Sequence, residues 1–142
     1  MDPMVKDLLK ELLPLAGPLV AVVNILIARA KTNQEEKQKL AKVSQAVSNA
    51  LEKTDAYLEY LRSGGTRRGK YEPELAELWR TAGFELSQIA ETKEEREMAS
   101  RLRLKARAWE YIEQWPEERV KQEGIDFDTV RDRLSELERL TL

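Results

Sequence analysis

Residues 12–28 read LLPLAGPLVAVVNILIA, 17 consecutive residues without a charge. The rest of the chain is strongly polar by contrast, since 35% of all residues are charged. Such a segment is a secretory leader, a membrane-spanning helix, a buried core helix, or a core helix that a signal releases into a membrane. The choice among these four decides the fold and limits the function.

The residues around this segment argue against a leader and against a stable membrane span. Three acidic residues before it balance Lys6 and Lys10, whereas a leader needs a positively charged start. A membrane span needs about 20 apolar residues, and Pro14, Pro18 and Asn24 interrupt this shorter run. We therefore expect a core helix, with release into a membrane as an alternative.

Composition limits both the architecture and the chemistry. The chain has 142 residues, with only 6 glycines and 5 prolines, and Leu, Ala, Glu, Lys and Arg, which are good helix formers, dominate it. It has no histidine and no cysteine, so the usual neutral-pH general base and the usual nitrogen and sulfur ligands of zinc are missing. We expect one all-helical domain over residues 1–142, without catalytic activity, metal, cofactor or small-molecule substrate.

Capping residues and glycines mark the expected helix ends. We predict capping boxes at Thr32–Glu35 and at Thr92–Glu95, and a glycine-rich loop over residues 63–70. A short helix ended by Gly124 and a last helix capped by Asp126 or Asp128 are expected near the carboxyl terminus. The four main helices are expected over residues 15–31, 33–62, 73–90 and 93–114, and a kink at Pro14 and Pro18 separates the first from a short lead helix that begins near Pro3. Alternatively, the third and fourth helices run together with a bend near Thr92.

The later main helices each carry one apolar stripe at helical spacing. The predicted inward positions are Leu40, Val43, Val47, Ala50, Leu51, Thr54, Tyr57, Leu58 and Leu61; Leu75, Leu78, Trp79, Ala82, Leu86, Ile89 and Ala90; and Met98, Leu102, Ala106, Trp109 and Ile112. Three stripes need one apolar element on which to converge. We therefore expect the first main helix to be central and buried on nearly all sides, through Leu15, Leu19, Val20, Val23, Ile25, Leu26 and Ile27.

These expectations together define an all-α fold. It is a four-helix up-and-down bundle over residues 4–114 with the hydrophobic helix at its centre. A small helical hairpin over residues 116–141 is added at the carboxyl terminus. Because the inward stripes contain no glutamate and the chain has no histidine, no helical di-metal site is expected.

The opening half of the chain resembles a known family. The stretch PLAGPLVAVVNILIARA (14–30), the long second helix and ELAELWRTAGFEL (74–86) are similar in pattern to the N-terminal helical bundles of HeLo-like cell-death proteins. The resemblance covers about residues 1–90. It implies an all-helical bundle whose first helix, residues 15–30, perturbs membranes once it is released.

A basic cluster lies in the glycine-rich loop. Arg62, Arg67, Arg68 and Lys70 place four positive charges in nine residues with no acid among them. They form a candidate contact for phosphate, and an anionic lipid suits them better than nucleic acid because the whole chain carries a net charge of −2. The simpler interpretation is a solvated loop between two helices.

Aromatic side chains supply the candidate partner interface. Trp115, Tyr60 and Tyr71 are the residues that we expect to contact a partner, because an aromatic side chain at a surface is a typical anchor. Lys105 is expected to lay its stem along Trp109 and extend its ammonium into solvent. The function expected first is a non-catalytic, cytoplasmic interaction module that docks on a partner protein or on itself. The alternative is a membrane-perturbing effector that associates with the bilayer on activation.

Overall fold

The computed structural model describes residues 16–67, 71–110 and 127–142. These ranges contain helices only, so the prediction of an all-helical fold is confirmed for the part of the chain that the structure describes. The elements are α2 (Ala16–Thr32), a single 3-10 turn η1 (Gln34–Glu36), α3 (Lys37–Arg62), α4 (Tyr71–Ile89), α5 (Lys93–Glu110) and α7 (Phe127–Thr141).

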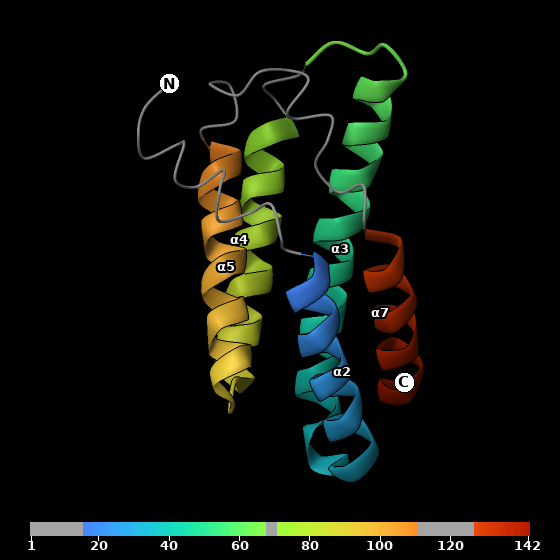
Figure 1. Cartoon of the computed structure of the whole chain (residues 1–142), viewed down its shortest axis with the longest axis vertical. Coiled ribbons are helices and arrows are strands. Elements are labelled where there is room, and N and C mark those ends of the chain that lie inside the picture. The colour runs from blue at the N-terminus through green and yellow to red at the C-terminus, as the bar shows by residue number, and fades with distance from the viewer. Residues whose placement is uncertain (1–15, 68–70, 111–126) are drawn as a thin grey trace.

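The longest helix, α3, lies at the centre of the bundle. It packs against α4 on one side and α7 on the other, α5 pairs with α4 along its length, and α2 lies mainly against α7 with smaller contacts to α3 and α5. Figure 1 shows that the chain direction reverses from each labelled helix to the next along one long axis. The central position expected for the hydrophobic first helix therefore belongs to α3.

The hydrophobic helix α2 is buried on one face, and the expectation of burial on nearly all sides is wrong. Its buried residues are Leu19, Val22, Val23, Leu26, Ile27 and Ala30. The opposite face exposes Gly17, Ala21, Asn24 and Ala28, while Val20 and Ile25 are half-buried. Glycine and alanine have little apolar area to hide, so this face needs no covering helix. Leu15 lies outside the described residues.

The last helix, α7, expected as half of a small added hairpin, packs into the main bundle. Val130, Leu134 and Leu137 are almost completely buried, and α7 packs against both α2 and α3. Arg133 Nε also donates a hydrogen bond of 2.7 Å to Asn24 Oδ1 of α2. The expected short helix ended by Gly124 lies outside the described residues.

One of the two predicted capping boxes is present. Thr92 Oγ1 accepts from the amide of Glu95 at 3.1 Å, and Glu95 Oε2 accepts from the amide of Thr92 at 2.8 Å. The box predicted at Thr32 and Glu35 is wrong, because α2 continues through Thr32. Asn33 caps η1 instead, and its Oδ1 accepts from the amide of Glu35 at 3.1 Å.

The predicted inward stripes agree with the observed burial. All nine predicted positions of α3 are buried, as are four of α5, from Met98 to Trp109; Ile112 lies outside the described residues. Of the positions predicted for the third main helix only Leu78 and Ala90 differ, since both are half-buried, and Ala90 lies just beyond the end of α4. Gly83 lets α4 and α5 approach closely, because an added Cβ would lie 3.1 Å from the carbonyl oxygen of Ala99.

We expect Leu134→Ala to lower the free energy of unfolding by about 2–5 kcal/mol, since it removes a buried side chain and leaves a cavity among three helices. Glu138→Ala, on the exposed face of α7, serves as the control and should change the free energy by less than about 0.5 kcal/mol. Urea unfolding followed by circular dichroism measures both. A loss below about 1 kcal/mol for Leu134→Ala would contradict the place of α7 in the main bundle.

Candidate functional site

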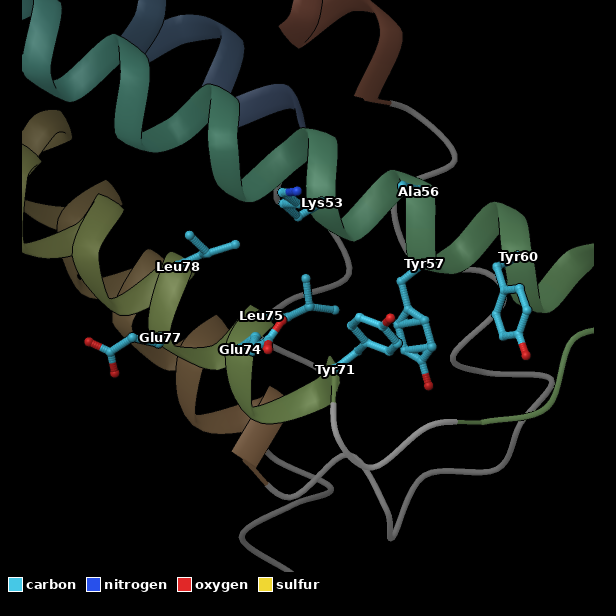
Figure 2. A pocket seen from close by; sticks show the side chains of 9 residues that line it. All are labelled: Lys53, Ala56, Tyr57, Tyr60, Tyr71, Glu74, Leu75, Glu77 and Leu78. Carbon is cyan, nitrogen blue, oxygen red and sulfur yellow. The ribbon is translucent and has the colours of Figure 1, made fainter.

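A groove with a volume of about 650 Å³ lies between α3 and α4. Figure 2 shows the two helices facing each other across it, near the end of α3 and the start of α4. A volume of this size lies within the range of ligand pockets in proteins. The lining side chains are Lys53, Ala56, Tyr57 and Tyr60 from α3, and Tyr71, Glu74, Leu75, Glu77 and Leu78 from α4.

Helical spacing explains why these residues share one groove. Lys53, Ala56 and Tyr60 follow one another at three- and four-residue steps, which places them on one side of α3. The same steps separate Glu74 and Leu78 on α4. Tyr57 and Leu75 lie one position further toward the core and are buried. The groove therefore has a buried apolar floor and walls that reach solvent.

Three tyrosines gather at one end of the groove. The Tyr57 ring lies 6.5 Å from that of Tyr60 and 6.3 Å from that of Tyr71, between centroids. Tyr57 also lies 6.2 Å from Trp109 of α5, so it connects the groove to the core. Tyr71 is 40% exposed. The structure thus brings Tyr60 and Tyr71 together, and their contact with a partner stays a prediction. Trp115 lies outside the described residues.

At the end of the groove where the three tyrosines gather, a buried carboxylate accepts a hydrogen bond from one of them. The Tyr57 hydroxyl donates to Glu72 Oε2 at 2.8 Å, and Arg67 Nε lies 3.2 Å from the same oxygen. Glu72 is buried, although it is not among the positions of the predicted inward stripe. Arg67, proposed as an anion contact, therefore already faces a carboxylate. Arg62 is exposed and lies 3.9 Å from Glu59.

Only part of the predicted anion site can be placed. Arg68 and Lys70 lie outside the described residues. The two described members, Arg62 and Arg67, each have an acidic neighbour that the sequence pattern did not reveal. A contact between this cluster and an anionic lipid therefore stays a prediction.

A polar pair and a buried cation lie below the floor of the groove. Trp79 Nε1 donates to Thr54 Oγ1 at 2.8 Å, which joins α4 to α3. The Lys105 ammonium lies 4.9 Å from the centre of the Trp79 ring, within the range of cation–π attraction. Lys105 is only 1% exposed. The expectation that Lys105 extends along Trp109 to solvent is therefore wrong.

A second polar cluster joins the carboxyl-terminal end of α2 to the turn between α4 and α5. Arg29 Nη2 lies 2.6 Å from Glu36 Oε1 and 3.3 Å from Glu91 Oε1, and its Nη1 donates to the carbonyl of Ile89 at 3.0 Å. Nη1 also forms an ion pair with Glu95. We call Arg29, Glu36, Glu91 and Glu95 the Arg29 cluster. Sequence analysis missed it because its partners are up to 66 residues apart.

The titration of Glu95 and Glu36 couples this cluster to pH. Burial raises the pKa of Glu95, but hydrogen bonds from Thr92 and Glu91, and the charge of Arg29, outweigh burial and hold the pKa below its usual value. The hydrogen bond from Arg29 lowers the pKa of Glu36. Both carboxylates therefore favour the folded state while they are ionised.

Two kinds of feature are not found among the described residues. Among them, no group of three or more acidic side chains could hold a metal ion. Within the same ranges, no helix combines the length and the hydropathy that a membrane crossing requires. Comparison of the chain with protein-family models, curated proteins and solved structures gives no match.

We expect Glu95→Gln to lower the free energy of unfolding at pH 7 by about 3 kcal/mol, because it leaves Arg29 without its buried partner. Since the pKa of Glu95 is lower in the folded chain, this difference between wild type and variant should shrink as the pH falls below about 4.5. Urea unfolding between pH 7 and pH 3 measures it. Glu97→Gln, an exposed change on the same helix, is the control. A difference that does not change with pH would contradict the assignment.

Proposed function

We propose that this chain is a non-catalytic interaction module, built as an up-and-down helical bundle, that binds a helix of a partner protein in the groove between α3 and α4. The groove itself carries the proposal, since it joins a concave apolar floor to aromatic side chains that reach its surface. Exposed apolar surface of this kind marks interaction sites. A cytoplasmic location stays a prediction of the composition.

The shape and the residues of the groove suit a helix. Two antiparallel helices leave a linear channel between them, and a third helix fills such a channel with side chains at three- and four-residue spacing. Tyr60 and Tyr71 offer large contact areas with few rotatable bonds, which limits the entropy lost on binding. Leu78 is half-buried, so a partner completes its burial.

We expect Leu78→Glu to weaken binding of the partner at least tenfold, which corresponds to about 1.4 kcal/mol, because it places a charge on the apolar wall. Purified wild type and variant are each used to isolate binding proteins from the cells that make this chain, and direct affinities are then measured by calorimetry. Phe84→Glu is the matched control, since Phe84 is 56% exposed on the same helix but does not line the groove.

Two results of this comparison contradict the proposal. One is a partner whose affinity is equal for wild type and for Leu78→Glu. The other is the absence of any direct partner that distinguishes Leu78→Glu from Phe84→Glu. Circular dichroism of both variants shows whether each retains the helical content of the wild type.

The alternative proposal is a membrane-perturbing effector that releases α2 from the bundle. The one apolar face of α2 and its attachment through Arg29 support it, together with the pattern-level resemblance to HeLo-like bundles. A helix of 17 residues extends about 26 Å, slightly less than the roughly 30 Å hydrocarbon core. An effector would therefore need self-assembly or local thinning of the bilayer.

The effector proposal predicts that Arg29→Ala releases dye from vesicles of phosphatidylcholine and phosphatidylserine faster than wild type does, because the variant loosens the carboxyl end of α2. The control is Arg139→Ala, which removes an exposed ion pair with Glu136 on α7. Fluorescence dequenching of trapped dye measures the release. If neither wild type nor Arg29→Ala releases dye, the effector proposal is wrong and the interaction module stands alone.

A further inference from the structure

The two walls of the groove carry charges of opposite sign. Figure 2 shows Lys53 on the α3 wall, and Glu74 and Glu77 on the α4 wall. Glu77 already forms an ion pair with Arg80. Lys53 and Glu74 are both exposed, and neither forms an ion pair with another residue that the structure describes. A partner whose charges all have one sign would therefore pair with one wall and be repelled by the other.

The tyrosines and the charges differ in their position along the groove. The tyrosines lie where α3 ends and α4 begins, and Lys53 and Leu78 lie toward the other end, as Figure 2 shows. Seven residues separate Lys53 from Tyr60 on α3, and seven separate Tyr71 from Leu78 on α4. Each separation corresponds to about 10 Å, or roughly two helical turns. The groove is therefore long enough for two turns of a bound helix, and its two ends differ.

The tyrosine end is suited to a bulky apolar side chain. The Tyr57 hydroxyl donates to Glu72, and the Tyr57 ring stacks on that of Tyr60 with 6.5 Å between their centroids. Tyr71, 40% exposed, completes this aromatic surface. Aromatic rings gain free energy from contact with further rings and with aliphatic groups. A partner helix therefore gains most at this end from an aromatic or branched aliphatic residue.

We propose that the helix bound in the groove carries acidic and basic side chains on opposite edges of its apolar face. Its acidic edge lies over α3 and meets Lys53, and its basic edge lies over α4 and meets Glu74. A bulky apolar side chain of the same helix enters the tyrosine end. This inference rests on the proposed function of the groove, and it adds the chemistry of the partner.

The wall charges select the partner and its direction. An ion pair at an exposed edge adds little affinity, but a helix with its charges reversed would place like charges together on both walls. The two edges of a helix exchange sides when the helix is turned end to end. A given partner therefore meets Lys53 with its acids and Glu74 with its bases in one direction only. Repulsion in the other direction supplies the specificity.

Selection from a library of displayed peptides tests the charge pattern. Each peptide is a helix of about 18 residues, roughly 27 Å long, with apolar residues at three- and four-residue spacing and with Glu, Lys or Gln at the positions that flank them. Groove ligands are the selected peptides whose affinity falls at least tenfold with Leu78→Glu and is unchanged with Phe84→Glu. We expect them to carry Glu on one edge and Lys on the other more often than the unselected library does.

Charge reversal on both molecules then identifies the contacts. Lys53→Glu should lower the affinity of the groove ligands about fivefold, since it turns an attraction into a repulsion. Lys42→Glu makes the same change in net charge at an exposed position of α3 outside the groove, and it should leave the affinity unchanged. Replacing one peptide glutamate by lysine should restore binding to Lys53→Glu, and replacing one peptide lysine by glutamate should restore binding to Glu74→Lys. Fluorescence anisotropy measures each affinity, and circular dichroism confirms the helical content of each variant.

The outcomes separate this inference from the proposed function. If groove ligands are found but Lys53→Glu and Lys42→Glu change their affinity equally, the inference is overturned, while their dependence on Leu78 still supports a helix in the groove. A loss in Lys53→Glu that no peptide exchange restores also overturns the inference, because the lysine then acts without a direct contact. If no selected peptide distinguishes Leu78→Glu from Phe84→Glu, the groove does not accept a helix, and the inference and the proposed function are overturned together.

Discussion

The central constraint on this structure is that α3 buries apolar surface on two sides at once. Its 26 residues extend about 39 Å, whereas α4 has 19 residues and α7 has 15. No single neighbour therefore covers the whole of α3. Helices α7 and α2 cover one side, the α4–α5 pair covers the other, and within the described residues the last turns of α3 lie beside the start of α4. The groove with its tyrosines lies at that end.

Charged side chains inside the bundle hold the helices in one relative position. Glu95, Glu72 and Lys105 are all buried, and each has an identified interaction with a residue on another element of the bundle or on the adjoining loop. A buried ion pair adds little net stability, but a shifted packing would leave its charges unpaired. Arg29 contacts three carboxylates and the carbonyl of Ile89, so it fixes α2 against a turn that is distant in the sequence.

The two ends of the bundle differ in their polarity. The end that holds the Arg29 cluster is closed by hydrogen bonds among charged groups, and its carboxylates titrate below their usual range. The opposite end holds the groove, with apolar and aromatic walls, Lys53 on the α3 wall and Glu74 and Glu77 on the α4 wall. The Arg29 cluster therefore lies far from the groove, whereas Glu72 lies next to it through its hydrogen bond with Tyr57.

The candidate site was predictable only in part. Tyr60 and Tyr71 stand out because both flank a glycine-rich loop between two long helices. Leu78 fits the inward stripe of α4 equally well, and only the unequal cover of α3 places it on a groove wall. Lys53 and Glu74 carry no signal in the sequence, because charged residues on a helix are ordinarily solvated. Both line the groove because of the helix that packs opposite each of them, and only the tertiary structure shows this.

The sequence by itself determined which residues form helices and which face of α3, α4 and α5 turns inward. These features follow from local rules, namely helix propensity, three- and four-residue spacing and the capping residues at Thr92 and Glu95. Tertiary structure alone decided that α3 and not α2 is central, that α7 completes the bundle, and that Arg29 meets Glu95. Periodicity defines the apolar face of a helix, but apolar contact is not directional, so only the packing of all the helices together selects the neighbour that covers it.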